Sequence, residues 1–285
     1  MIDISPALSD RIRNARAFVI DMDGTLALGD ALSGGHMALP GAIDFLALLR
    51  SRAVPFRIFT NGTAKPPAAY AASLRNAGFD LADAELMTPS TAAAHWFVRR
   101  KISKVRVLGS PGAAQPLEAA GIEIVEPSQK AEGVQAVFTA WFPDFSYRDL
   151  AAACEDVWRG ALLTSASNVP FFATTEGRAI GISFAINAMI RSLTSKRPRV
   201  LGKPSSSACH VALAQMGLPR SGATDVVVLG DDPALEMRMA HDCGAIALGV
   251  ATGIMKAGSA HALPANQRPH HLFDDLAGLA GIIAR

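Results

Sequence analysis

Short, continuously apolar segments alternate with helical patterns along this chain, and this alternation is the feature that most limits its fold. The clearest apolar segment covers residues 226–229. A similar segment at residues 17–20 precedes a helical pattern at 42–52, and another at 54–59 precedes a helical pattern at 66–77. Apolar strands separated by helices are typical of parallel sheets whose two faces are both covered. The sequence therefore predicts an α/β protein with a Rossmann-like, doubly wound parallel sheet.

Polar side chains stand where four of the predicted strands end. They are Asp21, Thr60, Lys203 and Asp231. In open α/β sheets, ligands bind outside the carboxyl ends of the strands. The sequence therefore predicts a functional site at this edge of the sheet.

The middle of the chain has the pattern of a separate module. The stretch between Asn61 and Lys203 is far longer than one crossover between neighbouring strands needs, and it contains strand and helix patterns of its own. We expect a smaller α/β cap domain at residues 88–198. It would be inserted into a core domain formed by residues 1–87 and 199–285.

Two carboxylates, Asp21 and Asp23, follow the first predicted strand directly, and Gly24 allows a sharp turn after them. Like charges this close repel and raise a pKa unless they are compensated, and a divalent cation would compensate them. One carboxylate could then act as a nucleophile and the other as a general acid and base. The structural alternative is a turn with two solvated aspartates.

Composition excludes several classes of protein. Of 285 residues, 50% are hydrophobic and 18% are charged, which excludes global disorder. The net charge of +2 comes without a basic stripe, so we expect no nucleic-acid partner. No apolar segment is long enough to span a membrane, so we expect no membrane partner either.

The cysteines point to a reducing environment. Cys154, Cys209 and Cys243 are far apart in the sequence and no CxxC motif occurs, which argues against a disulfide framework or a structural zinc site. The N-terminal segment lacks the apolar core of a secretory signal. A cytoplasmic location is therefore expected.

The Asp-x-Asp-Gly-Thr run at residues 21–25 resembles the first motif of the haloacid dehalogenase superfamily phosphatases. Thr60, Lys203 and Asp231 match the remaining motifs in chain order. The insertion between the second and third motifs resembles the type 2 cap of the class IIA branch, which includes p-nitrophenylphosphatase-like and nucleotide or sugar phosphatases. Further similar segments lie at residues 39–42, 60–62, 107–109, 145–147, 202–204 and 249–253.

The resemblance implies a role for each carboxylate. Asp21 would attack phosphorus and form an aspartyl-phosphate. Asp23 would protonate the leaving alkoxide and then deprotonate the hydrolytic water. Mg²⁺ would be held by the Asp21 carboxylate, the Asp23 backbone carbonyl and the Asp231 carboxylate, with waters completing the octahedron.

It also implies a phosphoryl-binding set. Thr60 would donate a hydrogen bond to a phosphoryl oxygen, and backbone N–H groups around Asn61 and Gly62 would help. Lys203 would pair with both Asp21 and the phosphoryl group. Taken singly, Thr60 could be a turn residue and Lys203 a solvated lysine. The functional interpretation therefore depends on all four motifs occurring in the family's order along the chain.

Two segments depart from the family pattern. The fourth motif usually has a second aspartate five residues after its first, and this position is Glu236. The segment at residues 165–170 lacks the aspartate that often follows the last strand of the cap. Asp232, which precedes Pro233, could be a helix N-cap, and this role is compatible with a part in the motif.

Side chains outside the motifs have structural interpretations. His36 lies in a glycine-rich stretch and is expected to be an exposed loop residue, with contact to a substrate as the alternative. Trp96, Trp141 and Trp158 are expected in the core or at an interface of the inserted domain.

The sequence thus predicts a Mg²⁺-dependent phosphomonoesterase that acts on a small phosphorylated metabolite. The alternative is a non-catalytic or regulatory ligand-binding protein that has kept the fold. The identity of the phosphomonoester remains open. The oligomeric state is open too, and a homodimer is compatible with the resemblance.

Overall fold

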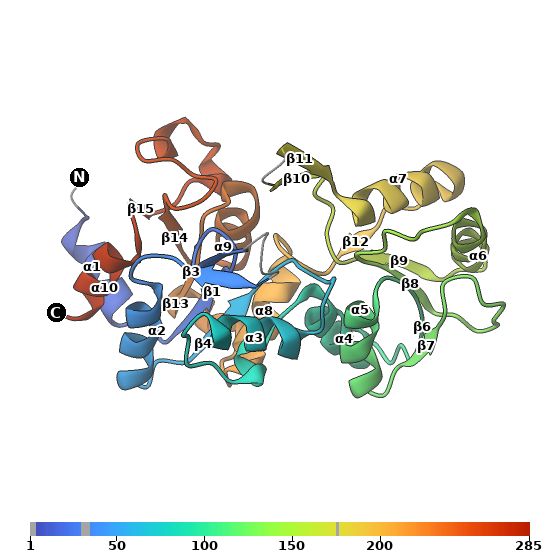
Figure 1. The fold of residues 1–285 in the computed structure, drawn as a ribbon, viewed down its shortest axis with the longest axis horizontal. Coiled ribbons are helices and arrows are strands. Elements are labelled where there is room, and N and C mark those ends of the chain that lie inside the picture. The colour runs from blue at the N-terminus through green and yellow to red at the C-terminus, as the bar shows by residue number, and fades with distance from the viewer. Residues whose placement is uncertain (1–3, 30–34, 175–176) are drawn as a thin grey trace. The chain divides into compact units, whose positions relative to one another are not determined.

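Two parallel β-sheets organise the chain, and each belongs to its own compact unit. The computed structural model describes residues 4–29, 35–174 and 177–285 (Figure 1). The first unit comprises Met1–Thr60, Tyr70–Met87 and Pro204–Arg285, and the second comprises Asn61–Ala69 and Thr88–Lys203.

The six-stranded sheet of the first unit is parallel throughout. Its strands, in spatial order, are β15 (His271–Phe273), β14 (Ile246–Val250), β13 (Val226–Gly230), β1 (Ala17–Ile20), β4 (Phe56–Phe59) and β5 (Leu86–Met87). All residues of β1, β13 and β14 are buried, as their apolar sequences predict.

Helices cover this sheet because their apolar stripes need a partner. Those of the first unit are α1 (Pro6–Arg13), α2 (Ala42–Ser51), α8 (Ser206–Gln215), α9 (Arg238–Cys243) and α10 (Leu276–Ile283), and α3 (Pro67–Asn76) begins in the second unit. One buried cluster joins Phe18 of β1 to Phe45 of α2 and Leu279 of α10. Helix α8 packs against β1, and α9 packs against β13 and β14.

The second unit contains a five-stranded parallel sheet of its own. Its strands, in spatial order, are β12 (Arg199–Val200), β9 (Leu162–Ser165), β8 (Ala136–Thr139), β6 (Lys104–Leu108) and β7 (Glu123–Val125). Its helices are α4 (Pro89–Arg99), α5 (Pro111–Ala119), α6 (Tyr147–Trp158) and α7 (Ile182–Thr194). One apolar cluster joins α4 and α5 to the sheet, and another joins α6 and α7 to it.

Two antiparallel hairpins, neither of them predicted from the sequence, interrupt the parallel pattern. Strands β2 (Ala27–Gly29) and β3 (His36–Ala38) pair in the first unit, where a loop was expected. Strands β10 (Phe171–Thr174) and β11 (Gly177–Ile180) pair in the second unit. Short strands next to glycine-rich segments give too weak a period-2 pattern to be recognised.

The predicted α/β class with parallel sheets flanked by helices is confirmed. The assignment of residues 88–198 to an inserted domain remains a prediction. Trp158, at the end of α6, is 65% exposed, so it does not belong to the core of its unit. Within the described part of the chain, no helix is both long and apolar enough to cross a membrane.

The interior of the second unit contains polar groups that bond to one another. Arg106 in β6 is fully buried, and its Nε donates to Asp156 Oδ2 at 2.6 Å. Its Nη1 donates to three backbone carbonyls of the segment after β7. At the ends of β8 and β9, Thr139 donates to Asn187 Oδ1, and Asn187 Nδ2 donates to Ser165 Oγ.

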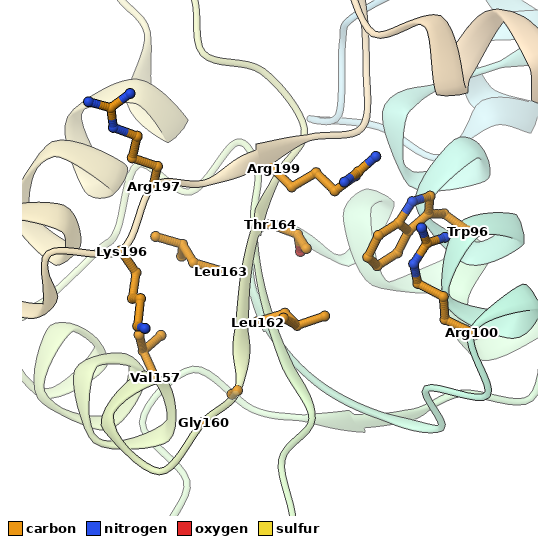
Figure 2. Close-up of a pocket in the computed structure, with 11 residues that line it drawn as sticks. Trp96, Arg100, Val157, Gly160, Leu162, Leu163, Thr164, Lys196, Arg197 and Arg199 are labelled. Carbon is orange, nitrogen blue, oxygen red and sulfur yellow. The ribbon is translucent and has the colours of Figure 1, made fainter.

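A cavity of about 440 Å³ lies at the β9–β12 edge of this sheet (Figure 2). Trp96 forms part of its wall, with the guanidinium of Arg100 3.9 Å and that of Arg199 5.3 Å from the ring centroid. Figure 2 shows Arg199 extending towards Trp96 while Arg197 points away from Thr164. Arg100 and Arg199 therefore flank the Trp96 ring while Arg197 points elsewhere, and the lining of the cavity includes none of the predicted site residues.

Candidate active site

Three neighbouring strands of the first unit end in the predicted polar residues. Asp21 follows β1, Thr60 follows β4 and Asp231 follows β13. The register pairs Ile20 of β1 with Leu229 of β13 and with Ile58 of β4, so the three strands end at nearly the same level. Parallel pairing therefore brings residues far apart in the sequence to one edge of the sheet.

Asp21 is held rigidly at this edge. Its side chain is buried, its Oδ2 accepts a hydrogen bond from Thr25 Oγ1 at 3.1 Å, and its backbone N–H donates to Leu229 O at 2.8 Å. The turn that follows needs Gly24, whose φ of +83° lies in the left-handed region. The Asp21 carboxylate is thus fixed by the strand before it and the turn after it.

Asp23 has a different environment from Asp21. Its side chain is 55% exposed, and its Oδ2 accepts a hydrogen bond of 3.3 Å from Thr60 Oγ1. On the other side, His36 Nε2 lies 3.7 Å from Asp23 Oδ1. The two carboxylates of the motif therefore differ: one is buried and fixed, and the other reaches solvent.

The expectation that His36 is an exposed loop residue is wrong. His36 begins strand β3, its side chain is only 8% exposed, and its Nδ1 lies 2.8 Å from Ser73 Oγ. The β2–β3 hairpin turns the chain back so that His36 approaches Asp23. The glycine-rich sequence around His36 gave no local signal of this pairing.

Asp231 lies against the turn that carries Asp21 and Asp23. Its buried Oδ2 accepts a hydrogen bond of 2.7 Å from Ile254 N. A Cβ on Gly24 would lie 2.5 Å from this oxygen, and a Cβ on Gly253 would lie 1.9 Å from it. Both glycines are required for the carboxylate to fit. Gly253 carries no chemistry of its own, so the sequence predicts no site role for it beyond its place in a family-like segment at residues 249–253.

The oxygen donors of this edge fit a hard divalent cation. Asp21 and Asp231 supply carboxylates, and the Asp23 backbone carbonyl belongs to the same turn. Among residues 4–29, 35–174 and 177–285, no group of three or more His, Cys, Asp or Glu side chains could hold a metal. Mg²⁺ keeps several waters and needs only one or two protein carboxylates, so this donor set suits it.

The Glu236 side chain is buried and is hydrogen-bonded to the backbone of its own turn. It lies on a π-helical turn, Pro233–Met237, that precedes α9, and its buried Oε2 accepts a hydrogen bond of 3.0 Å from Asp232 N. Asp232 caps the same turn by accepting from Ala234 N at 2.8 Å. In this structure, Glu236 supports the backbone after β13.

The prediction that Lys203 follows a strand of the same sheet is wrong: Lys203 comes after β12, which belongs to the five-stranded sheet of the second unit, and Asn61 also belongs to that unit. Asn61 and Lys203 form a reciprocal pair: Asn61 Nδ2 donates to Lys203 O at 3.1 Å, and Lys203 N donates to Asn61 Oδ1 at 2.9 Å. Lys203 is 2% exposed. A Cβ on Gly202 would lie 2.3 Å from Ala166 O, so the segment before Lys203 also packs closely against the 165–170 loop.

The structure thus brings the predicted residues together in two groups. The first unit assembles Asp21, Asp23, Thr60 and Asp231, and the second assembles Asn61 and Lys203. Gly62 follows Asn61 directly in the chain. His36 and Gly253 also lie at this edge of the first unit, although the sequence favoured an exposed loop position for His36 and predicted no role for Gly253.

Comparison with known proteins identifies the family. A model of haloacid dehalogenase-like hydrolases matches residues 18–123, and a model of HAD-hydrolase-like proteins matches residues 200–279. The chain belongs to the haloacid dehalogenase-like hydrolases, so the family predicted from the motifs is confirmed.

Relatives with known names cover nearly the whole chain. The 5′-nucleotidase YutF of Bacillus subtilis is 24% identical over 93% of this chain and 97% of its own length. An acid sugar phosphatase of Staphylococcus haemolyticus is 26% identical over 93% of this chain and 95% of its own. The crystal structure of a glycerol phosphate phosphatase from Mycobacterium tuberculosis in complex with magnesium is 26% identical, has a TM-score of 0.81, and covers 94% of this chain and 77% of that one.

Proposed function

We propose that this protein is a phosphomonoesterase that hydrolyses a small phosphorylated metabolite, with Asp21 as its nucleophile. One observation carries the proposal: buried Asp21 and buried Asp231 end neighbouring strands, and Asp231 lies against Gly24 in the turn that also carries Asp23. The names of the similar proteins support the same reaction class. They do not assign a substrate to this chain.

The different environments of the two carboxylates suit two different roles. Asp21, fixed by Thr25 and the strand backbone, would attack phosphorus as the bond to the leaving alkoxide breaks. Asp23, exposed and close to Thr60, would give that alkoxide its proton. It would then take a proton from the water that attacks the phosphorylated Asp21, which releases phosphate.

The negative charges of the Asp21 and Asp231 carboxylates and of a bound phosphate must be neutralised at this edge of the sheet. Mg²⁺, held by the Asp21 and Asp231 carboxylates and the Asp23 backbone carbonyl, would supply positive charge that lets an anionic nucleophile meet an anionic phosphate. Thr60 would donate its hydroxyl to a phosphoryl oxygen. We also propose Lys203 as a phosphoryl-binding cation, because its backbone is fixed by Asn61 and the residue is only 2% exposed.

The experiment is phosphate release from p-nitrophenyl phosphate and from a panel of sugar phosphates, glycerol phosphate and nucleoside 5′-monophosphates. Wild type, Asp21→Asn and Asp44→Asn would be compared with Mg²⁺ and with a chelator. Asp44 is an exposed residue of α2, so its variant controls for the loss of one carboxylate. We expect Asp21→Asn to retain less than about one hundredth of wild-type turnover, and Asp44→Asn to match wild type.

Two results would contradict the proposal. Near-normal turnover by Asp21→Asn would exclude Asp21 as nucleophile. No release by wild type from any compound, with Mg²⁺ present, would favour the alternative of a ligand-binding protein. The Glu236→Asp variant would then show whether Glu236 had disabled the chemistry.

A further inference from the structure

Two cysteines that are far apart in the sequence meet inside the first unit. Cys209 lies in α8, and Cys243 is the last residue of α9. Their sulfur atoms are 2.7 Å apart, because α8 and α9 pack directly against each other. The third cysteine, Cys154, lies in α6 of the second unit.

This separation is close to bonding distance. A disulfide has a sulfur–sulfur length of about 2.05 Å, so the two atoms need to approach by only a fraction of an ångström. Cys209 is fully buried, whereas Cys243 is partly exposed at the end of its helix. An oxidant in solution would therefore reach Cys243 first.

The two thiols also differ in acidity. The hydrogen bond from the Cys209 thiol lowers the pKa of Cys243, although burial opposes this effect. Donating that bond raises the pKa of Cys209 well above its usual value, and burial raises it further. Because the thiolate is the reactive form, Cys243 is the better nucleophile of the pair.

We propose that Cys209 and Cys243 are a redox modification site that forms a reversible intramolecular disulfide when a peroxide oxidises Cys243. The Cys243 thiolate attacks one oxygen of hydrogen peroxide, which forms an S–O bond, breaks the O–O bond and releases hydroxide that is protonated to water. The Cys209 sulfur, after losing its proton, attacks the Cys243 sulfur and displaces the oxygen as a second water. The two sulfurs lose two electrons in total, and one peroxide is reduced to two waters.

The disulfide would tie together two segments that follow predicted site residues. Helix α8 begins shortly after Lys203, and α9 follows the turn after Asp231. The main effect of the disulfide would be on stability. A cross-link between residues 209 and 243 closes a long loop and therefore restricts the unfolded chain strongly. This inference does not depend on the proposed phosphatase activity.

The test uses the purified full-length chain, reduced and then treated with hydrogen peroxide in slight excess. We expect the number of thiols titrated after denaturation to fall from three to one, with dithiothreitol restoring all three. Peptide mapping without reductant should find Cys209 linked to Cys243. The melting temperature should rise by about 5–10 °C on oxidation, and the rise should reverse on reduction.

Matched variants separate this pair from general oxidation. Cys154→Ser should keep the disulfide and the rise in melting temperature, and Cys243→Ser should lose both. A wild-type protein that keeps three titratable thiols, or that links Cys154 or a second copy instead, would overturn the proposal. Since this measurement is made on wild type, it stands even where a variant fails to fold.

Discussion

Both sheets end in polar residues, but the kind of polar residue differs between the units. The first unit places the carboxylates of Asp21 and Asp231 after adjacent strands. The second places neutral Thr139 and Ser165 at the ends of β8 and β9, where Asn187 joins them in one hydrogen-bond network. A polar residue at a strand end is therefore not by itself a sign of catalysis.

The Arg106 charge in the second unit is buried away from the strand ends and has other partners. Arg106 lies inside β6 rather than at its end, and Asp156 and three carbonyl groups surround its guanidinium. Burying a charge is costly unless the charge is paired and hydrogen-bonded within the protein, as Arg106 is through Nε and Nη1. In the first unit, glycines at positions 24 and 253 leave room around a carboxylate instead. We therefore predict that the buried Arg106–Asp156 pair is structural, in contrast to the carboxylates of the first unit and to Lys203, which the proposed function uses.

The largest expected effect is on the stability of the second unit. Asp156→Ala would leave the Arg106 charge buried without its carboxylate, and we expect a loss of about 3–5 kcal/mol in the free energy of unfolding. Denaturant unfolding measures this loss. Turnover of the folded protein, assayed well below its melting temperature, should stay within about twofold of wild type.

Glu155 provides the control for this prediction. It is one residue earlier on α6 and pairs with Arg159, but both side chains are more than half exposed. Glu155→Ala should cost less than about 1 kcal/mol. If Asp156→Ala abolished turnover of a folded protein, the division between chemical and structural charges would fail.

The second prediction concerns activity in the first unit. Gly253→Ala would place a Cβ 1.9 Å from Asp231 Oδ2, so the carboxylate would have to move. A misplacement of about 1 Å at a catalytic group can cost about 100-fold in rate, and we expect a loss of that size in phosphate release. Gly281→Ala, in α10 with nothing near its Cβ, is the matched control and should keep full activity. Full activity of a folded Gly253→Ala variant would show that the Asp231 position is not critical.

The residues that could be predicted from the sequence are those whose place depends on strand order. Asp21, Thr60 and Asp231 each follow an apolar segment, and parallel strands align their carboxyl ends. The contacts of Gly253, His36 and Cys209 could not be predicted in this way. They depend on which loop or helix meets which across the fold, and periodicity within one segment contains no information about that partner.

Glu236 shows a different limit. The sequence predicts that Pro233 opens an ordinary helix, and Asp232 does cap it. The first turn is π-helical, and it directs Glu236 back to the Asp232 backbone. Helix type over a single turn depends on how nearby side chains pack, and a motif position alone does not specify it.

The smallest predicted effect tests whether the His36 side chain of the first unit contributes to the chemistry. His36 Nε2 lies 3.7 Å from Asp23 Oδ1, which is beyond hydrogen-bond distance, and Ser73 Oγ lies 2.8 Å from the other ring nitrogen. We predict that His36 is a positioning residue that acts through Asp23. We expect His36→Ala to lower kcat about two- to fivefold with KM unchanged, because a contact of this kind contributes at most about 1 kcal/mol.

A packing role for His36 predicts a different pattern. Its ring also lies 6.5 Å from that of Tyr70, so its removal could loosen this part of the unit without touching the reaction. In that case the melting temperature would fall while kcat of the folded protein stayed constant. Ser73→Ala distinguishes the two roles further. This variant keeps the His36 ring but removes the Ser73 hydroxyl that contacts it. A positioning role predicts a smaller decrease in kcat than His36→Ala causes, whereas a packing role predicts no decrease in kcat.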